Sequence, residues 1–294
     1  MKDTTSGESS AKAGEQLSTI EKFRTMHQSG CFALPNPWDA GTAVYLQHLG
    51  FEALATTSSG FAFTRGLPDA VTAITRDSML AHICDVVEAT PLPVNADFQN
   101  GYADDPEGVA TSVALCIATG VAGLSIEDAT GNNDAPLYEP GLAVDRIKAA
   151  RLAIQSSGVP VVLTARCEAW LVGEPDPLRV SLERLVAYAE AGADCLYAPG
   201  VSQPHEIAEI VRAVSPKPVN VLASRSNPAL SLSRLADLGV RRVSVGSALS
   251  LVAWGAFIRS ARSLKETGSF DSFADAASFK ELDDLFSNRS EALR

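Results

Sequence analysis

Polar side chains that could hold a cation stand at the ends of two short apolar runs. Alternate residues of one run are Asn95, Asp97 and Gln99, and a second run ends in Glu127. If these runs are neighbouring parallel strands, Asp97 and Glu127 lie about 5 Å apart and repel unless a proton or cation separates them. Oxygen and amide neighbours without His or Cys favour a hard cation, Mg²⁺ or alternatively Mn²⁺. The simpler alternative is two acids that reach solvent where loops begin.

A guanidinium stands on a third run. Thr164, Arg166 and Glu168 alternate there, so their side chains share one face of the expected strand. A guanidinium holds a planar carboxylate through two parallel hydrogen bonds, so Arg166 is a candidate for binding an acid substrate. The competing interpretation is a structural ion pair with Glu127 or Glu168.

Two turns could donate hydrogen bonds to a further anion. Thr57, Ser58 and Ser59, with the backbone before Gly60, could bind a second carboxylate or a phosphoryl group. Ordinary turn chemistry explains the same residues. The turn at 245–247 resembles a barrel phosphate site, which a phosphorylated sugar would need, but simple helix capping explains it equally.

The elements that must position these groups alternate strictly along the chain. Apolar strand-like runs occupy 31–37, 51–58, 93–99, 123–128, 160–167, 194–200, 218–223 and 241–246. Amphipathic helical patterns follow them at 40–49, 76–89, 106–119, 142–156, 177–191, 204–214, 231–238 and 248–266. Eight such pairs predict a closed (β/α)₈ barrel of the TIM type, whose working groups converge at the carboxyl ends of the strands. An open doubly wound sheet is the competing architecture, although no glycine-rich G-x-G-x-x-G turn occurs.

Composition limits the classes of protein. The chain has 294 residues, 46% of them hydrophobic, which excludes an intrinsically disordered protein. A net charge of −11 argues against nucleic acid or an anionic membrane as a partner. Five cysteines without C-x-x-C spacing, and no apolar leader or membrane span, predict a cytoplasmic protein. We expect a disordered tail over 1–16 and a single barrel domain with C-terminal helices over 17–294.

A family resemblance extends over about residues 23–256. Its motifs are LPNPWDAGTA (34–43), TTSSGFAFTRGLPD (56–69), VNADFQNGY (94–102), GLSIED (123–128), LTARCEAW (163–170), YAEAGADCLYAPG (188–200), KPVNVLA (217–223) and LGVRRVSVGSAL (238–249). In this order the chain resembles the isocitrate lyase / phosphoenolpyruvate mutase superfamily, specifically its phosphonomutase-like branch.

The resemblance implies a barrel whose last helix is exchanged between subunits, usually in a tetramer. It also implies Mg²⁺ and a small 2-oxo or 2-hydroxy acid substrate. Asp97 matches the family's direct metal ligand, and Glu127 matches the acid that holds the metal through water. Asp69 matches an acid near metal and substrate, Arg166 the arginine for the substrate carboxylate, and Asn220 a polar residue of the pocket. The turn at 56–60 matches the loop that holds the substrate acid.

The chain departs from the family pattern in two places. Gln99 stands where a second acid is common, so it could orient a metal-bound water but weakens the expected affinity for Mg²⁺. The loop after the fourth strand, EDATGNNDAPLYEP, contains neither the Lys-x-Cys of the lyases nor the lysine of the mutases. Cys167 should face away from Arg166 and serve as a packing residue.

These observations predict a Mg²⁺-dependent lyase or decarboxylase that acts on a small acid through a metal-stabilised enolate. The alternatives are a P–C bond mutase or hydrolase like phosphoenolpyruvate mutase, and a catalytically inactive acid-binding homologue. Residues 248–258 are apolar on nearly every face, which predicts a dimer or tetramer.

Overall fold

The computed structural model describes residues 5–71 and 73–292. The chain divides into two compact units, residues 1–247 and 248–294. The C-terminal helices make up the second unit. Within the described residues, no helix is long and apolar enough to cross a membrane.

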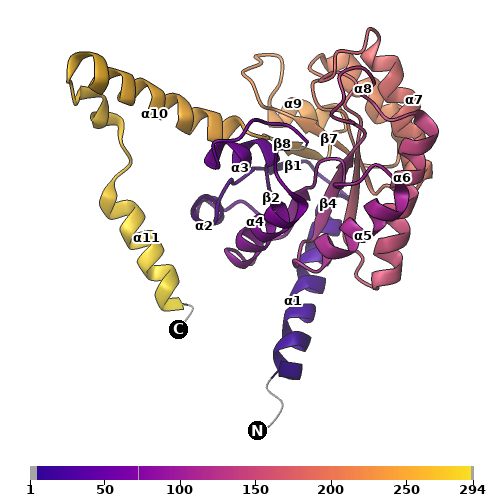
Figure 1. Ribbon diagram of the computed structural model, residues 1–294, viewed down its shortest axis with the longest axis horizontal. Coiled ribbons are helices and arrows are strands. Elements are labelled where there is room, and N and C mark those ends of the chain that lie inside the picture. The colour runs from indigo at the N-terminus through magenta and orange to yellow at the C-terminus, as the bar shows by residue number, and fades with distance from the viewer. Residues whose placement is uncertain (1–4, 72, 293–294) are drawn as a thin grey trace. The chain divides into compact units, whose positions relative to one another are not determined.

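The first unit contains a sheet of eight parallel strands. They are β1 (Phe32–Leu34), β2 (Leu54–Ala55), β3 (Val94–Asp97), β4 (Gly123–Glu127), β5 (Val162–Arg166), β6 (Cys195–Tyr197), β7 (Val219–Leu222) and β8 (Arg242–Ser244). Each lies inside its predicted run. The order β1-β8-β7-β6-β5-β4-β3-β2 brings the two edge strands round to each other, and the Ala55 amide donates to the Pro35 carbonyl at 3.0 Å across the seam. The expected (β/α)₈ barrel is therefore confirmed (Figure 1).

Helices connect successive strands around this barrel. They are α2 (Ala40–His48), α3 (Ser58–Thr64), α4 (Arg76–Glu88), α5 (Pro106–Ile117), α6 (Pro140–Ser157), α7 (Pro177–Glu190), α8 (Pro204–Val214) and α9 (Leu232–Asp237). Four of them begin with proline, whose missing N–H is harmless in the first turn. Thr75 caps α4 by accepting from the Ser78 amide, and Ser231 caps α9 by accepting from the Arg234 amide.

Two helices of this unit differ from the sequence expectation. Helix α1 (Thr5–Met26) covers most of the expected tail, while residues 1–4 lie outside the described residues. Its end is anchored by the buried side chains of Ile20 and Phe23. A helix anchored at one end extends at little cost through residues 11–16, where Ala, Lys, Glu and Gln are five of the six residues. Helix α3 begins inside the polar turn at 57–60, because Thr57 caps it by accepting from the Gly60 amide.

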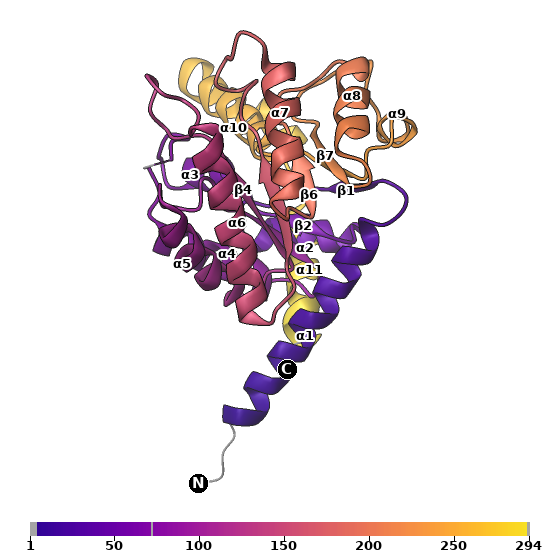
Figure 2. The same ribbon diagram turned by 90° about the vertical axis from the view of Figure 1, so that its right-hand side faces the viewer.

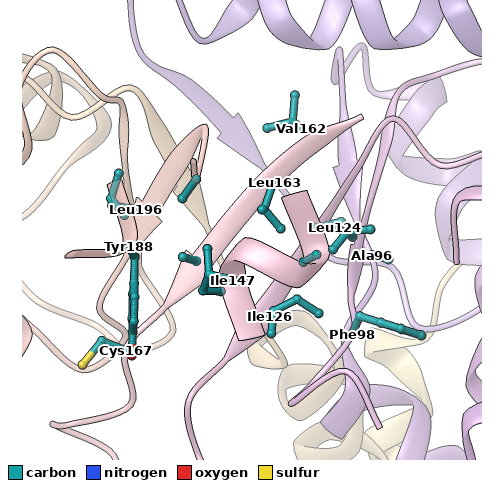
Figure 3. Close-up of a cluster of buried hydrophobic side chains, with 14 of the residues drawn as sticks. Ala96, Phe98, Leu124, Ile126, Ile147, Val162, Leu163, Cys167, Tyr188 and Leu196 are labelled. Atoms are coloured by element: carbon teal, nitrogen blue, oxygen red, sulfur yellow. The ribbon is translucent and has the colours of Figure 1, made fainter. Parts of the chain in front are cut away.

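The apolar core lies between the sheet and the helices. Leu124, Ile126 and Leu163 leave the outer face of β4 and β5 and are fully buried with Ile147 of α6 and Tyr188 of α7 (Figure 3). Burying one such side chain contributes about 1.5–3 kcal/mol to folding. The alternate residues of the same strands face the barrel interior, and there they are largely polar. The apolar packing therefore lies outside the sheet, and the polar side chains lie inside the barrel.

The second unit contains α10 (Ala248–Thr267), a 3₁₀ turn (Asp271–Asp275) and α11 (Phe279–Ala292). Helix α10 matches the predicted helical pattern, whereas the later elements are not predicted. Its apolar residues are largely exposed, with Leu251 at 51%, Val252 at 70% and Phe257 at 61%.

Candidate active site at the carboxyl ends of the strands

Arg166, the last residue of β5, joins three carboxylates at the carboxyl end of the barrel. Its Nη1 lies 3.3 Å from Oδ1 of Asp97 and 3.3 Å from Oε2 of Glu127. Its Nε donates to Oε1 of Glu168. Glu127 and Arg166 are direct neighbours in the register of β4 and β5. Asp97, Glu127 and Arg166 thus lie together as expected, and an ion pair of Arg166 with Glu127 and Glu168, the competing interpretation, is present.

Asp97 is fixed from the side of β2 and α3. Its Oδ2 accepts from both the amide and the hydroxyl of Ser58, each at 2.8 Å. The Asp97 amide donates to Oγ1 of Thr56 at 2.9 Å. Ser58, predicted to bind a substrate acid, thus holds a carboxylate of the protein itself. Because Oδ2 is engaged by Ser58, Oδ1 is the oxygen that faces Arg166.

The site carries more negative than positive charge. Three carboxylates surround the single guanidinium, so the cluster has a formal excess of negative charge. Burial raises the pKa of Glu127 well above its ordinary value, the charges of Glu168 and Asp97 raise it further, and Arg166 opposes both. Burial likewise raises the pKa of Glu168, again against the effect of Arg166. Glu127 and Glu168 are therefore the acids of this site most suited to holding a proton.

Two buried polar atoms in the segment after β3 lack a hydrogen-bond partner among the described residues. They are Oε1 of Gln99 and the hydroxyl of Tyr102. Burial and the charges of Asp97 and Glu127 raise the pKa of Tyr102, which places its hydroxyl close to both acids. Such groups cost about 1–3 kcal/mol each when they are left unpaired. A water or hydrated ion beside each group would satisfy it.

These residues fit a hydrated hard cation by the chemistry of their donors. The carboxylates of Asp97 and Glu127 and the amide oxygen of Gln99 are the oxygen ligands that Mg²⁺ prefers, and Mg²⁺ commonly uses only one or two carboxylates. Among the residues described, no three His, Cys, Asp or Glu side chains gather as a metal cluster. Nη1 of Arg166 contacts both of these carboxylates.

The strand alternation used for Gln99 fails at that residue. Strand β3 ends at Asp97, and Gln99 and Tyr102 adopt left-handed backbone conformations with φ of 47° and 57°. Both φ values are unusual for residues with a side chain. The Gln99 carbonyl nevertheless accepts from the Glu127 amide at 2.9 Å, which ties this loop to β4.

Arg146 of α6 holds the same loop from outside the barrel. It is 1% exposed, and its guanidinium donates to the carbonyls of Asn100, Ala103 and Asp104. Tyr138 lies under it, 3.9 Å from the guanidinium carbon to the ring centroid. These contacts explain how the loop keeps two unusual backbone conformations. Nothing in the sequence of α6 distinguishes Arg146 from a surface arginine, so its role is not predicted.

Asp128 performs a similar task for Glu168. Its Oδ1 accepts from the Glu168 amide at 2.8 Å, and its Oδ2 accepts from the Tyr188 hydroxyl at 2.6 Å and from Arg184 at 3.2 Å. Asp128 follows Glu127 and points to the other side of the strand, as period-two alternation requires. It therefore positions Glu168 without facing the mouth.

The remaining residues predicted at the mouth have different surroundings. Asp69 is exposed and has no hydrogen bond among the described residues; crowding by protein atoms and the charge of Asp97 raise its pKa, while Arg166 lowers it. It therefore lies near the cluster. Oγ1 of Thr57 accepts from the Gly60 amide at 3.2 Å and lies 3.3 Å from Oγ of Ser59, which is turn and capping chemistry.

Asn220 lies in a polar network inside the barrel. Its Nδ2 donates to Oγ of Ser244 at 2.9 Å, and its Oδ1 accepts from Nε of Arg242 at 3.0 Å. Arg242 also donates to Oγ1 of Thr164 at 3.0 Å, and its Nη1 is 3.4 Å from Nε2 of His27. Both polar ends of the Asn220 amide are thus occupied by the protein. Arg242 is not predicted from the sequence, although its spacing of two from Ser244 places both residues on one strand face.

Two further expectations can be compared with the structure. In the turn at 245–247, the amides of Val245 and Gly246 both donate to Oδ1 of Asn36, at 3.0 and 2.8 Å, so they serve the protein's own side chain. Cys167 is fully buried, and burial raises the pKa of its thiol, as expected for a packing residue.

Comparison with known proteins agrees with this fold. The phosphoenolpyruvate phosphomutase family matches residues 23–265. A crystal structure of a proposed lyase/mutase from Burkholderia cenocepacia J2315 is 48% identical, with a TM-score of 0.89 over 93% of this chain and 97% of that chain. An uncharacterized protein of Mycobacterium tuberculosis H37Rv is 34% identical over 228 residues, 76% of this chain and 81% of the relative. The 2-methylisocitrate lyase of Escherichia coli K12 is 32% identical over 173 residues, 56% of each chain.

The eight-stranded barrel, the acid–arginine cluster at its mouth and these similarities lead to the same assignment. The chain belongs to the phosphoenolpyruvate phosphomutase family, within the isocitrate lyase / phosphoenolpyruvate mutase superfamily of lyases and mutases that act on small carboxylic acids.

Proposed function

We propose that the protein is a Mg²⁺-dependent lyase or decarboxylase acting on a small 2-oxo or 2-hydroxy acid. The observation that carries this proposal is the contact of one guanidinium, Arg166, with the carboxylates of Asp97, Glu127 and Glu168. A divalent cation supplies positive charge that stabilises an enolate developing when a bond next to the oxo group breaks. Asp97, Glu127 and Gln99 are the residues that would hold it.

The chain's own residues have separate tasks in this proposal. Ser58 keeps Oδ2 of Asp97 in place, so Oδ1 is free to exchange its contact with Arg166 for another cation. Arg166 then presents its Nη1 edge to the substrate carboxylate and remains oriented by Glu168. Glu127 is a carboxylate when it holds the cation, and it can then accept a proton at a carboxyl oxygen.

The loop after β4 decides which bond is broken, and here it is closed on itself. Ala129 and Leu137 form an antiparallel bridge, and Oγ1 of Thr130 donates to the Ala135 carbonyl at 2.6 Å. The loop has neither Lys nor Cys to act as an acid. Proton transfer is therefore left to carboxyl groups of the barrel.

A substrate screen tests the proposal. Purified protein is incubated with 2-oxo and 2-hydroxy dicarboxylates and with phosphonopyruvate, with and without Mg²⁺, while pyruvate and other products are followed. We expect C–C cleavage or loss of CO₂ that requires Mg²⁺. The Arg166→Ala variant should lose about 10²-fold or more in kcat/KM, because positioning and charge stabilisation disappear together.

Thermal stability with and without the cation tests the proposed metal site. Mg²⁺ or Mn²⁺ should raise the melting temperature of the wild type, since a ligand that binds only the folded state stabilises it. The Asp97→Ala variant should lose this gain, whereas Asp145→Ala, an exposed acid on α6, should keep it. An equal gain in all three proteins would contradict a cation site at Asp97.

The match to the phosphoenolpyruvate phosphomutase family supports P–C chemistry as the second candidate. Turnover of phosphonopyruvate alone in the same screen would favour a mutase or hydrolase. Binding of acids without turnover of any would favour an inactive acid-binding protein, for which Gln99 in place of a second acid is the supporting feature.

A further inference from the structure

A groove of about 650 Å³ lies at the opposite end of the barrel from the candidate active site. It is bounded by the end of α1, by the segment between α8 and β7, and by the starts of β5, β6 and β8. Figure 2 shows the loop that leads from the end of α1 into β1. Its polar lining consists chiefly of Arg24, His27, Asp194, Ser215, Lys217 and Arg241. Because the strands run parallel, their first residues and the cluster at Arg166 lie at opposite ends of the sheet. The groove is therefore a separate feature.

Two cations of this groove have no carboxylate partner among the described residues. Lys217 is half-buried, and its ammonium has no hydrogen bond or ion pair there. Arg241 is also half-buried, and its Nη1 donates to the Gly30 carbonyl at 3.2 Å. Partly desolvated charges without a counter-ion are costly, and an anion in the groove would relieve that cost.

The one carboxylate among the described lining residues is already engaged. Oδ2 of Asp194 accepts from Arg151 at 2.5 Å, from the Leu163 amide at 2.9 Å and from Arg24 at 3.4 Å. Asp194 thus fixes Arg24 at the wall, and its own charge is matched by two arginines. Arg24, Lys217 and Arg241 together leave the groove positively charged.

A third unpaired cation lies directly behind the wall. Arg242 is 2% exposed and contacts only neutral partners among the described residues: Asn220, Thr164 and His27. Burial and the charge of Arg242 lower the pKa of His27 to about 3, so the imidazole is neutral. Its Nδ1 donates to the Phe23 carbonyl, leaving Nε2 as an acceptor facing Arg242. Among the described residues, no carboxylate forms a hydrogen bond or ion pair with Arg242.

We propose that this groove is a binding site for a small polyanion that carries phosphate or several carboxylate groups. The volume lies in the range of small-molecule sites, about 300–1,000 Å³. Guanidinium and ammonium groups are the usual partners of phosphate and carboxylate. The chain carries a net charge of −11, so such a concentration of unpaired positive charge is local and specific rather than a general property of the surface.

Titration with simple anions tests this site. Pyrophosphate and citrate are titrated into the full chain by calorimetry and thermal shift, with NaCl of equal ionic strength as reference and without Mg²⁺, which both anions chelate. We expect saturable binding of at least one anion. Lys217→Met and Arg241→Met should each weaken its affinity about tenfold or more, because each removes roughly one charged contact. The matched control Lys148→Met removes one exposed positive charge from α6 and should bind like the wild type. Tighter binding of pyrophosphate or of citrate distinguishes a phosphate-bearing ligand from a polycarboxylate.

The Arg166→Met variant separates this groove from the mouth of the barrel. It should bind the anion with wild-type affinity, because Arg166 lies at the other end of the strands. Lys217→Met should also fold with unchanged or higher thermal stability without anion, since it removes an unpaired half-buried charge. Binding that persists in both groove variants, that disappears in Arg166→Met, or that NaCl reproduces would overturn the proposal.

Discussion

Ser58 donates two hydrogen bonds to Asp97, one from its backbone amide and one from its hydroxyl, and both reach the same carboxylate oxygen at 2.8 Å. The contact joins the first turn of α3 to the tip of β3. It means that the position of the candidate metal ligand depends on how α3 begins. Thr57 sets that beginning as the N-cap.

Removing the Ser58 hydroxyl should loosen Asp97 without removing the backbone contact. A hydrogen bond to a charged group contributes about 1.5–3 kcal/mol, so Ser58→Ala should lower the free energy of unfolding by roughly that amount. The Mg²⁺ concentration that gives half-maximal stabilisation should also rise several-fold. Ser59→Ala is the matched control, because its hydroxyl has no contact with Asp97. Equal effects of the two substitutions in denaturant titrations would show that Ser58 acts only through the helix.

Stability should depend on pH through Glu127. Burial raises its pKa in the folded protein above the ordinary value of 4.5, so the native state holds this proton more tightly than the unfolded chain. Its contribution to stability is therefore complete below pH 4.5 and declines as pH rises toward the raised pKa. Glu127→Gln should remove this decline, about 1.4 kcal/mol per pH unit for one proton. Exposed Glu139→Gln should leave the profile unchanged; an identical profile for Glu127→Gln would refute the assignment.

Activity should survive mild treatment with iodoacetamide. Cys116, Cys167 and Cys195 are buried, and burial raises the pKa of each thiol, which suppresses the reactive thiolate. The loop after β4 contains no cysteine. Rapid inactivation that substrate prevents, traced by mass spectrometry to a single cysteine, would restore a thiol as the acid catalyst.

The exposed apolar residues of α10 should bind a second copy of the chain. Leu251, Val252 and Phe257 leave their apolar side chains largely exposed to water. Large exposed apolar patches commonly mark interaction surfaces. We expect a dimer or tetramer by light scattering at micromolar concentration. Phe257→Asp should dissociate it, whereas Lys265→Asp, near the polar end of the same helix, should not. A monomeric wild type would contradict the prediction.

Strand positions were predictable because the sheet is buried on its outer face and alternates strictly with helices. All eight strands lie in their predicted runs, and the same period of two placed Asp97, Glu127 and Arg166 on the inner face. The period of two failed for Gln99 because its backbone is left-handed, and Arg146 on a distant helix maintains that conformation. Long-range contacts of this kind leave no local pattern.

The inner residues show the same limit. Asn220 was correctly placed on an inward face, but its partner Arg242 lies on another strand. The side-chain oxygen of Asn220, expected to face a substrate, accepts a hydrogen bond from Arg242 instead. Similarly, the hydroxyls at 57–59 suggested an anion site, whereas they cap α3 and hold Asp97. Composition and spacing identified the polar groups, but the partner of each was decided by the fold.

The polar interior also determines how the strands align. An apolar interior would tolerate a slip of two residues, because inward side chains would still face inward. Arg242, Asn220 and Thr164 instead form directional hydrogen bonds across β8, β7 and β5, and a slipped strand would leave buried donors and acceptors unpaired. The buried guanidinium thus selects one shear of the barrel, and with it the one alignment in which Arg166 meets Asp97 and Glu127.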